Sequence, residues 1–447
     1  MSDLITINTT IKDQVAEALD FGTPLIVGYH NNYADRVREY NVRTYAAELV
    51  ADGFTADQSD AIYQAAVALA GSNAEGTLPP TFKVGRRAGQ SQRLVRLIPT
   101  AVDATVYSGK LNGTVWTFTS VDAVLANILA GIEAAIVGVG AAVTTDDTSG
   151  THLDITGNVA DEWFTLRDLS HNFTISDETP LPGTDIQTDL AAIYAEDPDW
   201  YGLIVADARS KVQVVDADVF ARGKSGEVLY IPVSNDTAVA NGTASNVALT
   251  IQALTSHETG VMYGYATMGY WPEAAWFAVT LPKPAGRISW AAWTLTGVPQ
   301  ETVTSITSSQ RSNLATASVN YYAPNKGLGW TRNGWAASGR YFDLTRGKDS
   351  LNDELDTEIS TVLANANKVP YTRDGFALIM GVVRGVLDGY AEGTDPFLVK
   401  SSIQIHTGVP SDQTSAEKAA RSYTVGTWQA TAAGAIHNAT ITGVITI

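Results

Sequence analysis

The two ends of the chain share a pattern in which apolar and polar residues alternate. Near the N-terminus, Ile5, Ile7 and Ile11 fall on one side of an extended segment, because side chains of a strand point to opposite faces in turn. No second strand follows closely enough to form a hairpin, so we expect this strand to pair elsewhere. The C-terminal segment 435–447 also has a strand pattern. Its apolar positions are Ile436, Ile441, Ile445 and Ile447.

Between the termini, strand patterns and helix patterns follow one another. Residues 24–28 form an uninterrupted apolar run that ends in glycine, which is typical of a buried strand. From about residue 186 onward, helix and strand alternate, which indicates a partly parallel sheet. We expect helices over 37–50, 57–70, 185–194 and 247–255, and strands over 81–87, 201–206, 227–233 and 260–265.

Residues 92–185 interrupt this pattern and resemble an independent module. Asn112 and Gly113 lie between two strand-like segments and form the dipeptide preferred by tight hairpin turns. The clearest helix of the chain follows, with apolar residues from Val121 to Ile136 at helical spacing. We expect strands over 94–98, 104–107, 152–156 and 164–166. Because the earlier pattern resumes afterwards, we interpret the module as a peripheral insertion.

The C-terminal part of the chain contains two amphipathic helices. One carries apolar residues from Leu351 to Leu363, with Ser350 and Asp353 spaced like a capping box. The other runs over about 376–390. Further strands are expected over 402–405, 422–428 and 435–447.

These patterns predict a multidomain subunit of the α/β and α+β classes, with an α/β core, an inserted small α+β domain and extended terminal β-strand arms. The predicted parts are an N-terminal arm (1–20), a first part of the core (21–91), the inserted domain (92–185), an α/β core (186–300), a C-terminal core domain with the two amphipathic helices (301–430) and a C-terminal strand arm (431–447).

Composition and charge narrow the range of functions. The 447 residues carry a net charge of −18, so a global basic surface for nucleic acid is absent. There is no cysteine, which excludes disulfides, thiolate metal sites and a cysteine nucleophile. No apolar run approaches the ~20 residues needed to cross a bilayer, and the first residues lack a secretory signal pattern. We therefore expect a protein that is made and kept in the cytosol.

Catalytic and nucleotide-binding motifs give no match. Residues 223–225 (GKS) resemble the end of a phosphate-binding loop, but Asp218 stands where that motif requires glycine. Asp216 and Asp218 are interpreted as residues of a solvated turn. His257 and Glu258 are interpreted as part of a loop that leads into a strand.

Two further groups have a structural interpretation as well as a functional one. His152 and Asp154 share a strand face, but no third metal ligand is near them in sequence, so a surface pair is the simpler interpretation. The aromatic residues between positions 263 and 276 suit stacking on a sugar, but packing in a core or an interface is the favoured interpretation, because the strand pattern buries such residues anyway. We predict no enzymatic activity, no metal and no cofactor.

Two groups of basic residues stand out in this acidic chain. The first group is Lys83, Arg86, Arg87, Arg93 and Arg96. The second group is Lys326, Arg332, Arg340, Arg346 and Lys348. Our first interpretation is a solvated face with ion pairs inside the chain, and the alternative is a docking surface for an acidic partner.

Several short segments are similar to those of one known protein family. The strongest covers residues 334–343 (GWAASGRYFD) and is followed by 346–349 (RGKD) and 369–372 (VPYT). Others lie at 21–28, 82–86, 416–421 and 433–437. In this order and spacing they resemble the shorter subfamily of phage contractile tail sheath proteins. The resemblance spans nearly the whole chain and is weakest over 92–180.

The resemblance implies a structural protein of the phage virion. Sheaths of this family form stacked six-subunit rings around a tail tube, and contraction drives the tube into the host envelope for genome delivery. The energy is stored in the extended lattice, so no nucleotide site is needed. The implied partners are further copies of the chain, the tail tube protein, and baseplate and tail terminator proteins, with no nucleic acid and no membrane insertion. Assembly is implied to take place in the host bacterial cytoplasm.

The resemblance also gives roles to the termini and to the second basic group. Sheath subunits lend their terminal strands to a neighbour's sheet, which here implies exchange through the isoleucines at both ends. In this family the C-terminal core lines the inner wall. The implied tube-facing residues are Arg340, Arg346 and Lys348, with Lys418 and Arg421 as second choice.

Two other functions stay open. A tail tube or baseplate protein belongs to the same class, although tube proteins are usually far shorter. A carbohydrate-active enzyme or lectin would use the aromatic residues between positions 263 and 276.

Overall fold

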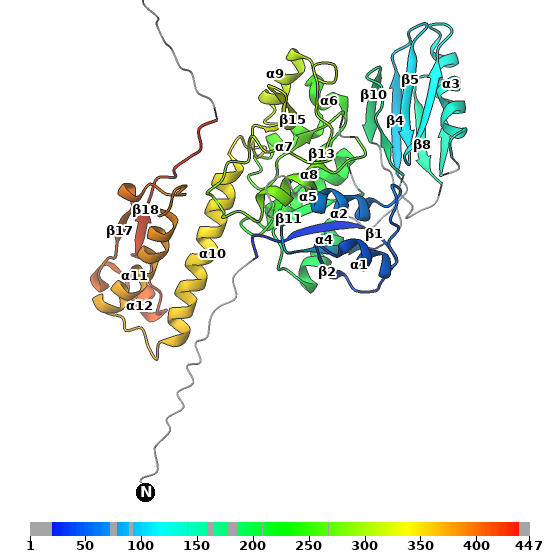
Figure 1. Cartoon of the computed structure of the whole chain (residues 1–447). Coiled ribbons are helices and arrows are strands. Elements are labelled where there is room, and N and C mark those ends of the chain that lie inside the picture. Colours follow the sequence, from blue (N-terminus) through cyan, green and yellow to red (C-terminus); the bar gives the residue numbers. More distant parts are fainter. Residues whose placement is uncertain are drawn as a thin grey trace, which may run out of the picture. The chain divides into compact units, whose positions relative to one another are not determined.

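The computed structural model describes residues 20–71, 78–88, 93–140, 142–158, 164–177, 186–207, 209–266 and 268–437. These residues form two compact units (Figure 1). The large unit contains the described residues of 20–346 together with 435–437, and the small unit contains 347–434.

A five-stranded sheet organises the large unit, in the order β12-β11-β1-β3-β2. All pairings are parallel except that of β2 with β3. The uninterrupted apolar run in β1 reflects its central position, because a strand covered on both faces has no polar side. The strands are β1 (Pro24–Tyr29), β2 (Val37–Asn41), β3 (Thr81–Arg87), β11 (Gly202–Val205) and β12 (Leu229–Tyr230).

Helices cover both faces of this sheet. Ile26 of β1 packs into one hydrophobic cluster with residues of α2 and α8, whereas Leu25 and Val27 pack into another with residues of α4 and α5. Alternate side chains of one strand thus enter two separate cores, which defines a three-layer α/β/α arrangement. The helices are α1 (Tyr45–Ala51), α2 (Ala61–Gly71), α4 (Ile186–Glu196), α5 (Lys211–Gly223) and α8 (Pro272–Thr280).

A second, four-stranded sheet continues the large unit in the order β13-β14-β15-β16. Its first three strands are parallel, and β15 and β16 form an antiparallel hairpin. The strands are β13 (Val233–Ser234), β14 (Met262–Tyr263), β15 (Asn320–Asn325) and β16 (Leu328–Arg332), and the accompanying helices are α6 (Thr237–Asn241), α7 (Val247–Ala253) and α9 (Ser308–Thr316).

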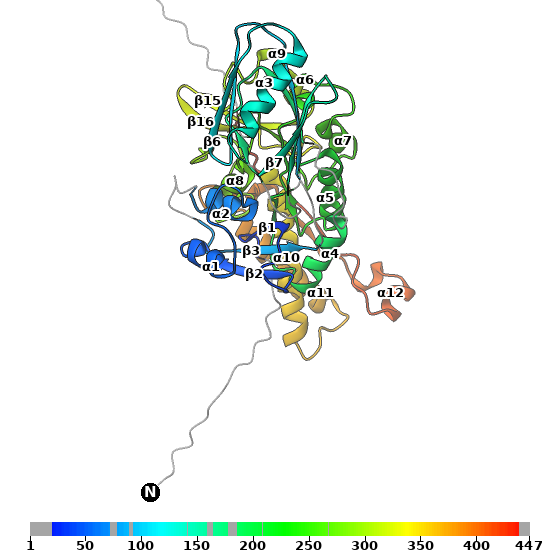
Figure 2. The ribbon, with the colours of Figure 1, turned by 90° about the vertical axis from the view of Figure 1, so that its right-hand side faces the viewer.

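Between β3 and α4, the chain forms two further sheets and one helix. Asn112 and Gly113 connect β5 to β6 with φ angles of 46° and 84°, the left-handed conformation that a tight hairpin turn requires. Figures 1 and 2 show α3 beside these strands, and the helix contacts β6 and β7. The sheets run β10-β4-β8-β7 and β6-β5-β9. The elements are β4 (Leu94–Pro99), β5 (Val106–Leu111), β6 (Thr114–Thr119), α3 (Leu125–Val137), β7 (Val143–Asp146), β8 (Leu153–Gly157), β9 (Leu166–Arg167) and β10 (Phe173–Asp177).

The small unit consists mainly of helices. Its buried residues belong to neither of the two large hydrophobic clusters. The apolar stripe of α11 provides much of its core, including Phe376, Met380 and Leu387. The elements of the C-terminal region are α10 (Phe342–Asn365), which begins in the large unit, α11 (Arg373–Tyr390), η1 (Lys400–Ser402), β17 (Gln404–His406), η2 (Pro410–Asp412), α12 (Ser415–Ala419) and β18 (Thr427–Gln429).

Several sequence-based expectations require correction. The helix predicted over 37–50 is wrong in its first part, because Val37–Asn41 is the edge strand β2 and the helix starts at Tyr45. Ser350 lies inside α10, not at its N-terminus, so it does not form a capping box. Residues 435–437 are not in a strand. The domain boundaries predicted at 20, 91, 185, 300 and 430 stay predictions. In the structure, the two units divide between residues 346 and 347.

No helix within the described residues is long and apolar enough to cross a membrane.

Candidate assembly surfaces

The small unit carries a sheet of only two strands. β17 and β18 pair antiparallel with Ile405 opposite Trp428, and a bridge between Leu398 and Ala432 extends the pairing. All three side chains of β18 are exposed. Among the described strands, none pairs with an outer edge of this sheet. Because an isolated two-stranded sheet is marginally stable in water and an open edge offers unpaired backbone groups, this sheet is suited to accept a further strand.

The segment between β17 and β18 packs on α11 and is held by hydrogen bonds within itself. The ring of Tyr423 packs on Phe376 of α11 with a centroid distance of 4.3 Å, and its hydroxyl donates to the Thr407 carbonyl at 2.6 Å. The buried Gln413 amide donates to the Ser422 carbonyl and to the Thr424 hydroxyl, each at 3.0 Å. These contacts connect the two ends of the loop with each other and, through Tyr423, with α11.

The predicted strand arms lie mostly beyond the part of the chain that the structure describes. Ile5, Ile7, Ile11, Ile441, Ile445 and Ile447 are all outside the described residues. Ile436 is described and its side chain is 87% exposed. The neighbouring His437 contacts the large unit, where its ring is 2.8 Å from the Ser289 hydroxyl and stands edge-on to Tyr341. Exchange of strands between subunits stays a prediction.

One tube-facing candidate is wrong. Arg346 is only 2% exposed, so it cannot contact a partner protein. Its guanidinium donates to the carbonyls of Thr280 at 3.0 Å, Leu281 at 2.6 Å and Phe21 at 3.0 Å. Thr280 ends α8 and Leu281 is its C-cap, so Arg346 supplies positive charge where the helix dipole is negative.

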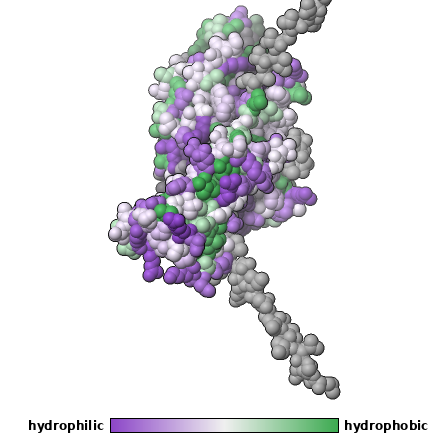
Figure 3. Space-filling model, turned by 90° about the vertical axis from the view of Figure 1, so that its left-hand side faces the viewer, coloured by the Kyte–Doolittle hydropathy of each residue, from purple (hydrophilic) through white to green (hydrophobic). Residues whose placement is uncertain are grey.

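The other candidates are accessible. Lys348 has a side chain that is 47% exposed and forms an ion pair with the buried Asp349 at 3.4 Å. Arg340 is half-buried. Lys418 lies in the last turn of α12, and both it and Arg421 are exposed. Their contact with a tail tube stays a prediction. Figure 3 shows one face of the molecule, on which hydrophilic residues surround a few hydrophobic patches.

The first basic group forms ion pairs within the chain, as expected. Lys83 binds Asp197 at 2.7 Å, and Arg96 binds Asp154 at 2.8 Å. Arg87 is buried and donates to Asp207 at 3.0 Å. The expected ion pairs are therefore confirmed for these three residues. The expected solvated face is wrong, because Lys83, Arg87 and Arg93 are buried.

The residues considered for catalysis have structural roles. The expectation that Asp218 lies in a solvated turn is wrong, because it is fully buried on α5 and binds Arg222 at 2.9 Å. Lys224 follows α5 and places its ammonium 3.8 Å from the centre of the Tyr194 ring. His152 is 3.6 Å from Asp154, and no group of three potential metal ligands occurs among the described residues.

Most aromatic residues between positions 263 and 276 are buried, namely Tyr263, Tyr265, Trp271 and Trp276, so packing is the confirmed interpretation for them. Trp276 is fully buried and packs edge-on against Trp290. Every residue of α8 is buried, and the helix was missed because it is apolar all round and has no helical stripe. Pro272 at its first position was the available signal, since proline favours that site.

Comparison with known proteins gives a structural match. No family model matches the chain, and no curated protein sequence gives a significant match. A chain in the cryo-EM structure of the contracted sheath complex of an extracellular contractile injection system (PVC) has a TM-score of 0.53, with 9% identity over 99% of this chain and 97% of that one. The chain has the fold of a contractile-sheath protein.

A second solved structure is also similar over nearly the whole chain. A chain in the 6-fold symmetrised cryo-EM structure of the anti-feeding prophage baseplate has a TM-score of 0.54, with 10% identity over 99% of this chain and 100% of that one. The sheath tail protein from Desulfitobacterium hafniense is more distant, with a TM-score of 0.44 and 11% identity over 90% and 93% of the two chains. The sheath fold thus extends over the inserted module and the small unit, which confirms the predicted mixed α/β and α+β class.

Proposed function

We propose that this chain is the sheath subunit of a phage contractile tail. In this proposal, subunits with the sheath fold polymerise as six-subunit rings around a tail tube, and contraction drives the tube through the host envelope. The observation that carries the proposal is the open two-stranded sheet of the small unit, formed by β17 and β18. The similarity to a chain of a contracted sheath complex supports a structural role.

Strand addition explains how such an assembly holds together while it changes shape. A strand that makes about four backbone hydrogen bonds contributes roughly 2–6 kcal/mol per junction, and each subunit takes part in several junctions. Main-chain pairing does not depend on the side chains of a rigid interface, so it persists when bodies rotate about flexible connections. The arms proposed to add to the sheet are the isoleucine-containing segments at the two ends of the chain.

The proposed setting follows from the assembly. The subunit assembles in the host cytoplasm, becomes part of the virion and works with a tube protein, a baseplate and a tail terminator. Energy stored in the extended lattice drives contraction, so neither a nucleotide nor another cofactor is required.

Electron microscopy of the purified protein tests the proposal. Long hollow cylinders are expected from a sheath subunit at high protein concentration. Discrete ring-shaped particles would instead favour a baseplate position, which is the second candidate because one similar chain comes from a baseplate structure. A protein that stays monomeric at all concentrations, in the presence and absence of its tube, would contradict both candidates.

A further inference from the structure

The hairpin of β15 and β16 presents apolar and basic side chains to solvent. Figure 2 shows the two strands at the periphery of the large unit. Residues 328, 330 and 332 of β16 point to one side, because side chains of a strand alternate between its two faces. They are Leu328, which is 62% exposed, and the partly exposed Trp330 and Arg332. Tryptophan and arginine are residue types that are enriched in protein interfaces, so this side of the hairpin has the composition of a contact surface.

The opposite side of the hairpin is fixed to the core. Thr331 is buried, and its hydroxyl donates to the Trp290 carbonyl at 3.0 Å. Tyr322 is also buried, and its hydroxyl accepts the Leu295 backbone N–H at 3.1 Å. The exposed side is therefore held in place before any partner binds, so little conformational entropy is lost when a contact forms.

The turn of the hairpin places a lysine at its tip. Lys326 and Gly327 have φ angles of 50° and 88°, the pattern of a tight type I′ turn. The first position of such a turn favours asparagine, aspartate or glycine, because other side chains are disfavoured at positive φ. Lysine does not stabilise this turn, and its exposed charge is the property that distinguishes it. Lys326, Leu328, Trp330 and Arg332 are called the hairpin face below.

The two charges of the hairpin face are not neutralised by acids of the described chain. Residues 302–342 contain no acidic residue, although the whole chain has 47. Among the described residues, Lys326 and Arg332 form no ion pair. Arg332 donates instead to the Pro324 carbonyl at 3.1 Å, and its guanidinium carbon is 5.9 Å from the centre of the Trp330 ring. The hairpin face thus combines two positive charges with exposed apolar groups and suits an acidic partner that also has apolar residues.

A surface of the opposite character lies on α10 in the small unit. Residues 349–367 include acidic residues but neither lysine nor arginine. Asp356 and Leu363 are both exposed, and they share one side of the helix because they are seven residues, about two turns, apart. Ile359 lies between them and is partly exposed. Asp356 forms no ion pair with any described residue. Asp356, Ile359 and Leu363 are called the α10 face below.

We propose that the hairpin face of one copy of this chain binds the α10 face of a second copy. The ammonium and guanidinium groups of the hairpin face pair with Asp356 and its acidic neighbours, and the leucine and tryptophan pack on Ile359 and Leu363. Opposite charges set the orientation of the contact, and the apolar residues supply the buried area. The chain itself is a suitable acidic partner, since its net charge is −18.

This contact is heterologous, because the two faces differ. Each copy binds one neighbour through its hairpin face and another through its α10 face, so the contact repeats and generates a ring or an open filament. The inference rests on the proposed function and deepens it, since it names one contact between sheath subunits.

Charge reversal in the full-length chain tests the hairpin face. The variant with Lys326→Glu and Arg332→Glu is expected to give about tenfold fewer sedimentable cylinders at ordinary salt, because like charges then meet at the contact. Ultracentrifugation and electron microscopy measure the yield, and an unchanged Tm shows that the variant is folded. The matched control carries Arg43→Glu and Arg373→Glu, which change the net charge equally at exposed positions outside both faces, and is expected to assemble like wild type.

A charge swap identifies the partner surface. Asp356→Lys and Ser360→Lys place two lysines on the side of α10 that carries the α10 face. These changes alone are expected to reduce the yield of cylinders, whereas a chain that carries them together with both hairpin changes is expected to assemble again, because the two faces are then complementary with reversed signs.

Three results would overturn the proposal. Assembly of the hairpin variant at the wild-type yield, with or without loss of tube binding, would exclude a contact between copies through this face. Loss of assembly that the charge swap does not restore would exclude the α10 face as the partner. Absence of cylinders from wild type would refute the proposed function and this contact with it, whereas the first two results would refute the contact alone.

Discussion

Replacing Arg346 with methionine tests whether this residue stabilises the large unit and does not serve as a contact for the tube. Methionine retains most of the apolar stem and removes the guanidinium. Thr280 keeps a second donor, the Lys283 N–H at 3.2 Å, so the carbonyls of Leu281 and Phe21 depend most on Arg346. A buried group left unpaired costs ~1–3 kcal/mol, which gives a destabilisation of about 2–6 kcal/mol.

Tryptophan fluorescence on heating is a suitable assay. Nine of the ten tryptophans precede residue 347 in the sequence, and Trp428 is the exception, so the signal reports mainly on the large unit. The expected lowering of Tm is about 4–8 °C for a unit of this size. The Tm of Arg346→Lys is expected to lie between those of wild type and Arg346→Met, because one ammonium group cannot donate to three carbonyls as a planar guanidinium does.

Glu354→Met is the matched control, since Glu354 lies on the same helix and is exposed. Its Tm is expected to stay close to that of wild type, because exposed substitutions rarely change stability by more than ~0.5 kcal/mol. The reasoning would be refuted if Arg346→Met melted like Glu354→Met, or if Arg346→Met melted normally but failed to bind the tube.

Three further predictions address assembly and pH. Deleting residues 1–13 or 436–447 is expected to leave a folded monomer, checked by light scattering and electron microscopy, and normal cylinders from either truncation would refute strand exchange. Reversing charge at Lys348 and Lys418 is expected to reduce tube-bound sheath at ordinary salt while empty cylinders still form, and unchanged tube binding would exclude both residues. Burial raises the pKa of Glu273 from 4.5 to about 7 despite the nearby Arg209. The folded state therefore binds the proton more tightly than the unfolded state, and stability falls as pH rises from about 4.5 to 7. Glu273→Gln should flatten this dependence of Tm on pH, and an unaltered slope would contradict the prediction.

The local elements were predictable where one physical rule dominates. The apolar run of β1 indicated a strand covered on both faces, and Asn112-Gly113 fixed a hairpin, since few other dipeptides accept two positive φ angles. The isoleucine spacing of α3 indicated one buried helix face. By contrast, β2 was mistaken for helix, because only Tyr40 of its five residues is buried and a short edge strand has little periodicity.

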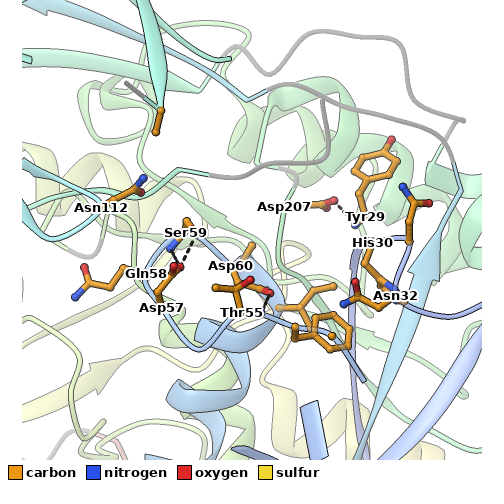
Figure 4. Close-up of a pocket in the computed structure, with 16 residues that line it drawn as sticks. Tyr29, His30, Asn32, Thr55, Asp57, Gln58, Ser59, Asp60, Asn112 and Asp207 are labelled. Atoms are coloured by element: carbon orange, nitrogen blue, oxygen red, sulfur yellow. Dashed lines mark hydrogen bonds between the residues drawn. The ribbon is translucent and has the colours of Figure 1, made fainter. Parts of the chain in front are cut away.

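The order of strands and the cavity at the end of β1 (Figure 4) were not predictable. β1 pairs with β11 across 170 and more residues of sequence, and no local pattern encodes which strand becomes its neighbour. The cavity depends on that pairing, because it joins the end of β1 to Asp207. His30 follows an apolar strand in the sequence, but the burial of its ring becomes visible only when Tyr33 and Phe54 are in place.

The basic residues show why charge patterns in a sequence do not separate surface from core. Arg346 and Lys348 are close in sequence, yet one is buried and the other exposed, because they fall on different sides of α10. Three of the hydrogen bonds of Arg346 go to backbone carbonyls, which every residue possesses, so these bonds leave no mark in the sequence. Arginine suits such a site since its fork of donors stays charged and satisfies several oxygens at once. A contact for the tube requires a basic residue outside the core, so Lys348, Lys418 and Arg421 are better candidates than the half-buried Arg340.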